Sequence, residues 1–544
     1  MAQERPNILW LTYEDTSPQF VSCYGHTPVE TTPCIDRLAS RGVRFNQAYA
    51  TSPVCSASRS AIITGVCNEA TGLGNHRSKY PLPRHEIPGF PKYLQAAGYY
   101  TTNNLKTDYN IDDEKAYIAD CWDDCSTEAH WRNRDNEQPF FSVFNYMDSH
   151  QSRTMTNTWG WYEENVLHAL PDEEVISPDN VEMPPIYRNN EEMKQHLSRV
   201  YNSLKLTDRL IAERLQELEE DGLAEDTIVF CFADHGEGIP RGKGNGIGFG
   251  YRASFVLYFP DKYAHLSPWG CQTVTDELVS FEDLAPTVLS LAGIDVPDYM
   301  TGRAILGDQR QAPPDYIFTA RNRIGDTPDL CRSAMDGKFV YTRNFFPHLP
   351  EVKYWAYGDF GGFQRTIRRD YKEGKLNETQ SQLLHPVRPV EYLYDLREDV
   401  WEINNLAGDP AYHDDLVRLR NATFKHIRET NDVMFLPETR MVENAQGSTP
   451  YEKRHDPTYN PLSEILEAAQ LVGGGEDVLP TQLELLAHDQ EAVRYWAAVG
   501  IFAQTAHIQE LDANGGAEHI LDQLKKALDD TSEIVCVELA ATLY

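Results

Sequence analysis

Two short apolar runs, each followed at once by two polar residues, place the strongest constraint on the fold of this chain. A continuous apolar run of this length is typical of a strand buried on both faces, in a parallel or mixed sheet covered by helices. In open α/β sheets, ligands bind at the carboxyl edge of the strands. The pattern therefore predicts polar pairs at a ligand-binding edge, although such pairs also cap helices or form turns. The runs and pairs are 8–13 with Glu14 and Asp15, and 228–233 with Asp234 and His235.

The pattern up to residue 320 predicts a central mixed, mostly parallel sheet flanked by helices. Apolar runs predict two further strands, and a period of about 3.6 residues predicts helices. An irregular, acidic stretch at 154–190 is interpreted as a surface insertion. The predicted strands are 139–147 and 251–259, the predicted helices are 88–100, 191–219 and 274–293, and 33–49 is predicted to hold a helix and a strand. We assign 1–320 to one α/β domain that carries the catalytic residues.

The character of the sequence changes twice after residue 320. Residues 331–346 predict paired antiparallel strands covered by a helix at 410–432, so 321–440 is assigned to a smaller α+β subdomain. Beyond it, a polar linker leads to amphipathic helices, one of which resembles a HEAT-type repeat. We therefore predict that 441–544 is a linker followed by a HEAT-like segment that binds partners or acts as a spacer. The linker is 443–461, and the helices are predicted at 462–470, 480–505 and 517–528.

The charge balance excludes some partners. The 544 residues include 49 basic and 83 acidic ones, which gives a net charge of −34. Nucleic acid and anionic membranes are therefore poor partners for the surface as a whole. The sequence has no apolar run of about 18 residues, so we predict no membrane span. Residues 1–15 lack the features of a signal peptide, so we expect a periplasmic or secreted protein if a leader has been removed and a cytoplasmic one otherwise. A homo-oligomer is left open.

Cys55 and Arg59 mark a reactive site. The thiol follows a short loop and starts a predicted helix, and the guanidinium lies four residues further on, which places both on one helix face. A helix N-terminus offers free N–H groups and the positive end of the helix dipole. An anion bound there would meet backbone donors and Arg59 together. A buried, inert cysteine is the alternative interpretation.

The segment Cys55-Ser56-Ala57-Ser58-Arg59 resembles the C/S-x-P/A-x-R signature of type I sulfatases, which belong to the alkaline phosphatase superfamily. The resemblance implies an alkaline-phosphatase-like fold and the oxidation of Cys55 to formylglycine by a maturation enzyme. The hydrated aldehyde carries two hydroxyls, of which one attacks sulfur and the other then expels sulfate. Ala57 replaces the Pro that the aerobic maturation enzyme prefers, which favours the radical maturase or a tolerant aerobic one.

The same resemblance implies a metal site at the ends of the two apolar runs. Glu14, Asp15, Asp234 and His235 are the implied ligands of one divalent cation, with Glu14 where the family more often has Asp. This oxygen-rich set suits Ca²⁺, with Mg²⁺ as the alternative.

Further roles follow from the resemblance. Lys106 and Lys243 are implied to flank the sulfate group together with Arg59, and His150 to protonate the leaving group. Asp108 stands where many sulfatases carry His, so we expect it to hold a sugar hydroxyl or an amine. The implied substrate contacts are His76, Arg77, Asp108, Arg153, Arg321 and Arg323.

These motifs predict a formylglycine-dependent sulfatase that acts on a sulfated sugar or oligosaccharide, through an O-sulfate or an N-sulfate. The chain most resembles bacterial relatives of N-sulfoglucosamine sulfohydrolase. Two alternatives stay open at this point. One is a phosphodiesterase or phosphonate monoester hydrolase of the same superfamily; the other is an inactive sulfated-glycan-binding protein in which residue 55 stays a thiol.

Overall fold

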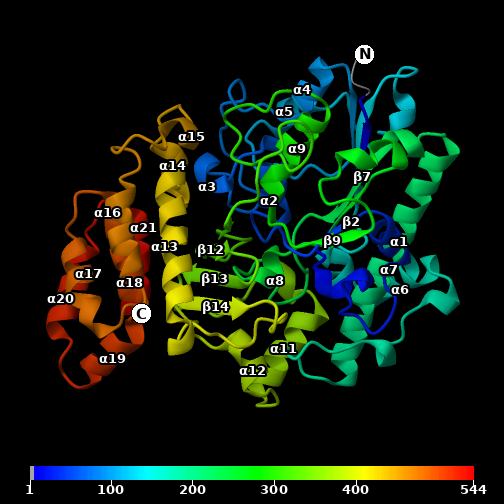
Figure 1. The fold of residues 1–544 in the computed structure, drawn as a ribbon. Helices are drawn as coiled ribbons and strands as arrows, with labels where there is room; N and C mark the ends of the chain where they lie inside the picture. The colour runs from blue at the N-terminus through cyan, green and yellow to red at the C-terminus, as the bar shows by residue number, and fades with distance from the viewer. Residues whose placement is uncertain (1–4) are drawn as a thin grey trace.

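The computed structural model, which describes residues 5–544, is organised around an eight-stranded sheet (Figure 1). Strand β1 (Asn7–Tyr13) lies between β6 (Phe140–Tyr146) and β7 (Thr227–Ala233) and runs parallel to both. The strand order is β5-β4-β6-β1-β7-β8-β2-β9, and β8 is antiparallel to both of its neighbours. The prediction of a mixed, mostly parallel central sheet is confirmed.

Short strands complete the sheet, and helices cover it. The other strands of this sheet are β2 (Val43–Phe45), β4 (Tyr100–Asn104), β5 (Asp124–Cys125), β8 (Phe255–Tyr258) and β9 (Thr273–Thr275), while β3 (Ala48–Tyr49) and β10 (Val279–Ser280) form a separate pair. The helices of this part are α1 (Pro33–Arg41), α2 (Cys55–Thr64), α3 (Asn68–Thr71), α4 (Pro91–Ala96), α5 (Glu114–Cys121), α6 (Trp159–Asn165), α7 (Glu191–Glu220), α8 (Gly248–Tyr251) and α9 (Leu284–Leu291).

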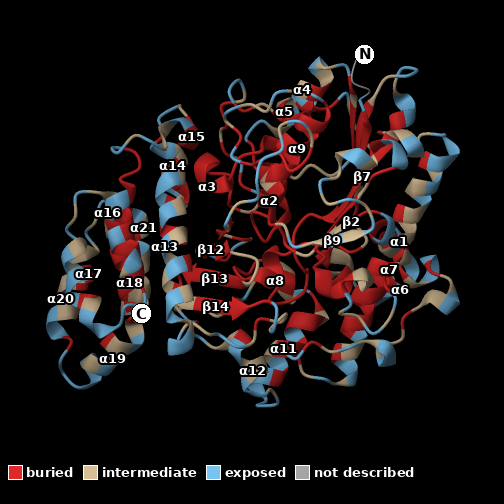
Figure 2. Cartoon of the chain, in the orientation of Figure 1, coloured by how far each residue is buried: buried red, intermediate tan, exposed pale blue. Residues whose placement is uncertain are grey.

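The central strands are buried on both faces, as their continuous apolar runs predicted (Figure 2). Trp10 of β1 packs edge-on against Phe141 of β6 and Phe232 of β7, with ring centroids 5.0 and 5.3 Å apart. Burying such aromatic side chains contributes a large share of a core's stabilisation, because each one removes a large apolar area from water.

Two predictions for this part were wrong. The segment 274–293 is not one helix, because β9 pairs with β2 and β10 pairs with β3 before α9 begins. The segment 154–190 is not only a surface insertion. It contains α6, and Tyr162, Val166 and Ile186 in it are buried.

A second sheet of four antiparallel strands follows the first, as predicted. Its strands, in order, are β11 (Ile317–Arg321), β12 (Cys331–Met335), β13 (Phe339–Asn344) and β14 (Glu391–Asp395). Helix α13 (His413–Thr430) packs on β12 and β13. The remaining helices up to residue 453 are α10 (Ala356–Asp359), α11 (Gly362–Lys372), α12 (Glu378–Ser381), α14 (Glu438–Glu443) and α15 (Pro450–Lys453).

The C-terminal part is helical and lies beside the second sheet, next to α13 (Figure 1). The predicted helix at 480–505 was wrong, because a turn at 486–490 divides it into two. The helices are α16 (Leu462–Gln470), α17 (Leu479–Leu485), α18 (Glu491–Phe502), α19 (Thr505–Ala513), α20 (Glu518–Ala527) and α21 (Glu533–Leu543). The HEAT-like repeat and the division into three domains stay predictions.

The C-terminal helices are joined to the rest of the protein by aromatic packing. The ring of Trp496 in α18 lies 5.9 Å from that of Phe345, 5.6 Å from that of Phe346 and 5.8 Å from that of Phe435. The indole N–H of Trp496 also donates to the carbonyl of Phe435 at 2.8 Å.

Across residues 5–544, the structure contains no helix with the length and apolar character needed to cross a bilayer.

Candidate active site

The register of the two central strands brings the two polar pairs together. Tyr13 of β1 lies opposite Ala233 of β7, so the residues that follow leave the sheet side by side. The backbone N–H of Asp15 donates to Asp234 Oδ1 at 3.2 Å. Asp15 has a φ of 53°, in the left-handed region, which turns the chain sharply after β1. The two pairs therefore form a single site at the carboxyl edge of the sheet.

Cys55 is the first residue of α2 and lies buried among these side chains. Its Sγ atom is 3.3 Å from His235 Nε2, 3.4 Å from Glu14 Oε2 and 3.8 Å from Asp15 Oδ1. Lys243 Nζ lies 3.1 Å away from the same sulfur. The thiol is thus placed at the centre of a dense group of ionisable side chains.

Two cations hold the acidic residues from the side of α2 and β4. Arg59 lies one helical turn after Cys55, and its guanidinium is 2.5 Å from Glu14 Oε1 and 3.1 Å from Asp234 Oδ2. Lys106, which follows β4, places Nζ 2.5 Å from Glu14 Oε2. Glu14 is therefore shared between two cations, as expected for a carboxylate with no exposure to solvent.

Lys243 and the two histidines lie near Asp15. Lys243 Nζ lies 2.8 Å from Asp15 Oδ1 and 3.2 Å from His150 Nε2. His235 Nε2 lies 2.9 Å from Asp15 Oδ1. We call the nine side chains that meet here the reactive cluster: Glu14, Asp15, Cys55, Arg59, Lys106, His150, Asp234, His235 and Lys243.

Hydrogen bonds constrain the protonation of the two imidazole rings. Both nitrogens of His150 face donors, because Nδ1 accepts from the backbone N–H of Ser152 at 3.1 Å and Nε2 lies 3.2 Å from Lys243 Nζ, which can only donate. His235 Nδ1 lies 2.9 Å from the carbonyl of Gly236, which can only accept, so Nδ1 carries the proton. The lone pair of His235 Nε2 then points into the cluster, in the orientation of a metal ligand.

Charge pairing and burial set the protonation of the reactive cluster. Burial raises the pKa of Asp15, but the neighbouring groups, with the charge of Lys243 first among them, outweigh burial and hold this pKa well below its usual range. Burial keeps the pKa of the Cys55 thiol well above its ordinary value despite the nearby lysines. Burial and the charge of Lys243 also hold the pKa of His150 well below that of a free imidazole. Asp15 is thus ionised while the thiol and His150 are neutral.

The cluster fits a divalent cation. Ligand atoms of Asp15, Cys55, Asp234 and His235 all lie within 4.8 Å of one another, and so do those of Glu14, Asp15, Cys55 and His150. Three carboxylates and one imidazole form an oxygen-rich set, which hard cations such as Ca²⁺ and Mg²⁺ prefer.

The six predicted substrate contacts lie around the cluster in different settings. Arg77 is exposed, and its Nε lies 3.4 Å from Asp108 Oδ1. The other four are placed as follows: the N–H of Gly325 lies 3.3 Å from His76 Nδ1, Arg153 pairs with Asp148, Arg321 pairs with Asp329 inside the protein, and Arg323 Nε lies 2.6 Å from Glu438 Oε2 of α14.

The sequence patterns missed several groups that hold the cluster. Asn145 accepts from Arg59 Nη1 at 2.7 Å, and the backbone N–H of Gln151 donates to Asp15 Oδ2 at 2.7 Å. Asn145 interrupts an apolar strand, which is a signal that could have been used. Glu237 lies two residues after His235 and is buried, and burial raises its pKa to about 8.

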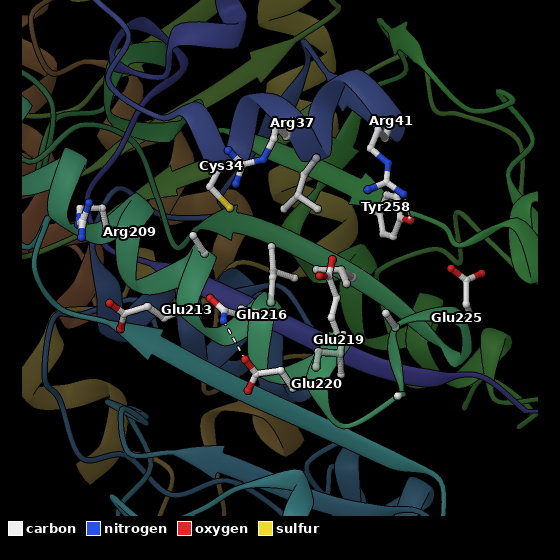
Figure 3. A pocket seen from close by; sticks show the side chains of 17 residues that line it. Cys34, Arg37, Arg41, Arg209, Glu213, Gln216, Glu219, Glu220, Glu225 and Tyr258 are labelled. Carbon is white, nitrogen blue, oxygen red and sulfur yellow. Dashed lines mark hydrogen bonds between the residues drawn. The ribbon is translucent and has the colours of Figure 1, made fainter. Parts of the chain in front are cut away.

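The wide surface hollows lie away from the reactive cluster. Figure 3 shows one of about 930 Å³, in which Arg37 and Arg41 of α1 face Glu219 and Glu220 of α7. It contains none of the predicted site residues. Two small spaces adjoin the cluster: Arg59 and Lys106 line one of about 30 Å³, and Lys243 lines one of about 40 Å³.

The fold and this cluster define a hydrolase of the alkaline phosphatase superfamily. The family model described as Sulfatase matches residues 6–294. An ulvan-active sulfatase of Formosa agariphila is 34% identical over 492 residues, which cover 84% of this chain and 80% of that protein. The human N-sulphoglucosamine sulphohydrolase is 24% identical and is matched over 79% of this chain and 92% of its own length. The chain belongs to the sulfatase family, whose members are sulfuric ester hydrolases.

Solved structures agree on the fold. A 2-O GAG sulfatase has a TM-score of 0.55 at 20% identity, over 79% of this chain and 93% of its own. The phosphonate monoester hydrolase of Agrobacterium radiobacter has a TM-score of 0.54 at 16% identity, over 78% of this chain and 96% of its own. Because both activities occur on this fold, the reaction has to be argued from the site and the family.

Proposed function

We propose that this sulfatase removes sulfate from a sulfated saccharide, that residue 55 acts as formylglycine, and that one Ca²⁺ lies in the reactive cluster. The observation that carries the proposal is the position of Cys55 Sγ, which is 3.1 Å from Lys243 Nζ and 3.3 Å from His235 Nε2. The family supports formylglycine and a metal ion in general terms. The relatives named for ulvan and for N-sulphoglucosamine support a saccharide substrate.

The acidic residues and His235 would hold the cation. Glu14, Asp15 and Asp234 would offer carboxylate oxygen atoms, and His235 would offer the lone pair of Nε2. The cation would supply positive charge beside a sulfate oxygen, and formylglycine would supply a hydroxyl nucleophile. Neither group comes from the chain as translated, which supplies a thiol and the metal ligands. The metal ion would be bound from solution, and the maturation enzyme would make the formylglycine.

The chain's own residues orient the sulfate group and balance its charge. Lys243 Nζ lies 3.1 Å from Cys55 Sγ, and Lys106 Nζ lies 2.5 Å from Glu14 Oε2, which is itself 3.4 Å from that sulfur, so a sulfate beside residue 55 would find two ammonium groups nearby. Arg59 holds Glu14 and Asp234 in place through two ion pairs. With its acids and cations paired in advance, the site needs little rearrangement when substrate binds.

His150 is placed to protonate the leaving group. Its Nε2 lies 3.2 Å from Lys243 Nζ, which in turn lies 3.1 Å from Cys55 Sγ, so the ring is close to the reacting group. Burial and the charge of Lys243 hold the pKa of His150 well below that of a free imidazole. The ring would therefore take up a proton once a bound sulfate offsets the charge of Lys243, and it would then deliver that proton from Nε2 to the departing oxygen or nitrogen, which leaves as an alcohol or an amine.

The test compares substrates after maturation. The chain is expressed with a radical maturase, and the peptide that carries residue 55 is examined by mass spectrometry. We expect formylglycine there, and faster hydrolysis of an aryl sulfate than of an aryl phosphodiester or an aryl phosphonate. Faster hydrolysis of the aryl phosphodiester or the aryl phosphonate would overturn the proposal and indicate a hydrolase of phosphorus esters. A mature protein that binds sulfated sugars without any turnover would indicate a binding protein.

A further inference from the structure

Six buried charged side chains form a second group beside the reactive cluster. We call it the cationic cluster: Arg241, Arg321, Asp329, Glu351, Lys353 and Arg388, each 9% exposed or less. Asp329 is shared by three cations. It pairs with Arg321 and Lys353, and it lies 3.0 Å from Arg388 Nη2. Glu351 Oε1 lies 2.8 Å from Arg241 Nε.

The cationic cluster carries more positive than negative charge. Four cations face two carboxylates, and the charge of a further acid, Glu402, also reaches Arg241. Burial raises the pKa of Glu402 to about 7, and its oxygens accept from the N–H groups of Gly248 and Phe249. With Glu402 ionised and Lys353 protonated, one positive charge is left without a partner, and an unpaired buried charge is costly. Burial and the neighbouring arginines accordingly lower the pKa of Lys353 well below its usual range.

A small cavity lies between the cationic cluster and the reactive cluster. It measures about 40 Å³, and Arg321, Lys353 and Lys243 line it. Since one water needs about 10–15 Å³ by this measure, the cavity has room for two or three waters or for one small anionic group. Lys243 Nζ also lies 3.1 Å from Cys55 Sγ, so one side chain, that of Lys243, connects the cavity to the reactive residue.

Unused hydrogen-bonding groups face this cavity. Arg321 is 3% exposed, and its Nε has no hydrogen-bond partner among residues 5–544. The amide oxygens of Gln151 and Asn245, which also line the cavity, lack partners too. Buried polar groups are normally paired, so these indicate a ligand that both accepts and donates hydrogen bonds. An anionic group next to sugar hydroxyls has that character.

The outer wall of the cavity is aromatic. Trp355 lines it, and it packs so closely on Gly325 that a Cβ there would lie 2.2 Å from Trp355 Nε1. Beyond Trp355, Tyr354 and Phe360 are 69% and 70% exposed. Exposed aromatic faces of this kind suit the apolar face of a sugar ring.

We propose that this cavity binds a second anionic group of the saccharide substrate, a carboxylate or a second sulfate, through Arg321 and Lys353. The inference rests on the proposed function and names the substrate class more closely: a sugar that carries a negative group in addition to the sulfate that is removed. That group would supply the negative charge that the cationic cluster lacks.

The first test uses the unaltered mature enzyme and matched substrates. One pair is a sulfated disaccharide with a uronic acid and the same compound as its methyl ester; the other is a disulfated sugar and its monosulfated counterpart. We expect kcat/KM to fall about tenfold to a hundredfold when the second charge is removed in one of the pairs, the size expected for a charged hydrogen bond. The pair that responds identifies the group. Equal kcat/KM within both pairs would overturn the proposal.

The second test uses Lys353→Met with Lys372→Met as the matched control, since Lys372 is exposed on α11. Asp329 keeps two arginine partners in the first variant, so the fold is expected to hold. We expect Lys353→Met to reduce the preference for the doubly charged substrate about tenfold or more, and Lys372→Met to leave it unchanged. A preference that survives in Lys353→Met would assign the cavity to structural water.

An aryl sulfate separates this inference from the proposed function. If no sulfate ester is hydrolysed by the mature wild type, the proposed function fails, whatever the cavity binds. If the aryl sulfate is hydrolysed and the matched pairs show no preference, only the second anion site fails.

Discussion

The reactive cluster and the cationic cluster are both buried and both rich in charged side chains, but they differ in the balance of positive and negative charge. In the reactive cluster, three carboxylates face Arg59, Lys106 and Lys243. In the cationic cluster, Asp329 alone faces three cations. A balanced group can take up a dication and a dianion together without a net change in charge, whereas a group with excess positive charge can take up an anion alone. The balance of buried charge therefore indicates what each place is built to receive.

The largest expected effect comes from Cys55→Ala. The variant removes the side chain that becomes the nucleophile, so we expect sulfate hydrolysis to fall by at least about 10⁴-fold, as for the loss of a nucleophile in other hydrolases. The measurement is kcat with an aryl sulfate after coexpression with the maturase. Cys67→Ala, at another buried free cysteine, serves as the control and is expected to keep its activity. Substantial turnover by Cys55→Ala would place the reactive group elsewhere.

Glu14→Gln is expected to rank second. It removes one carboxylate from the balanced cluster and leaves Arg59 and Lys106 without their shared partner. We expect hydrolysis to fall about a hundredfold or more and the midpoint for Ca²⁺ activation to rise, since a ligand is lost. Addition of Ca²⁺ to chelated wild type should raise Tm, and Glu14→Gln should respond less. Glu467→Gln, at an exposed position of α16, is the control. An unchanged Ca²⁺ response would remove Glu14 from the metal site.

Asp329→Asn tests the cationic cluster through stability. Burial opposes ionisation of Asp329, but its three cations outweigh that and keep its pKa below the usual range. Neutralising it leaves three buried cations without a partner, so we expect a loss of about 3–5 kcal/mol in the free energy of unfolding. Because this pKa is depressed, the stabilisation is present above about pH 4 and declines as the pH falls further. The variant and wild type should therefore converge in acid, as thermal unfolding at several pH values would measure.

The control for that variant is Asp326→Asn, at an exposed position three residues away. It should unfold like wild type. If Asp329→Asn is equally stable at pH 7, the three cations are not held by Asp329 in the way the distances indicate.

The smallest effect is expected for Asp208→Asn. Asp208 is a buried carboxylate that belongs to neither cluster. It accepts from the N–H groups of Cys34 and Ile35 at 2.8 and 2.9 Å, at the start of α1, and burial raises its pKa to about 7. With an unfolded pKa of about 3.9, its contribution to stability is complete below about pH 4 and is lost as the pH rises to about 7, by a few kcal/mol at most. Asp208→Asn should flatten this part of the Tm profile. Parallel profiles of variant and wild type would contradict the assignment.

Much of the fold was predictable from local sequence. Strands β1, β6 and β7 are buried on both faces, so their apolar runs alone set their positions to within about a residue. The prediction of a single helix at 274–293 was wrong because β9 and β10 form through pairing with the distant strands β2 and β3. Pairing of that kind leaves no periodic signal in the segment itself.

The candidate site was predictable in part for the same reason. Glu14, Asp15, Asp234 and His235 end two buried strands, and their strand register brings them together. Their roles stay predictions. Of the cationic cluster, the resemblance singled out Arg321 alone, because the members come from separate segments between residues 241 and 388 and the others are ordinary charged residues in the sequence. Only the folded chain shows that they share one carboxylate.

The packing of Trp496 has a consequence for how this protein can be cut or fused. A product that ends near residue 440 would leave Phe345, Phe346 and Phe435 facing water, an adhesive surface prone to aggregation. Anyone who designs a shorter version for expression should therefore keep the last hundred or so residues, or replace those three rings with polar side chains.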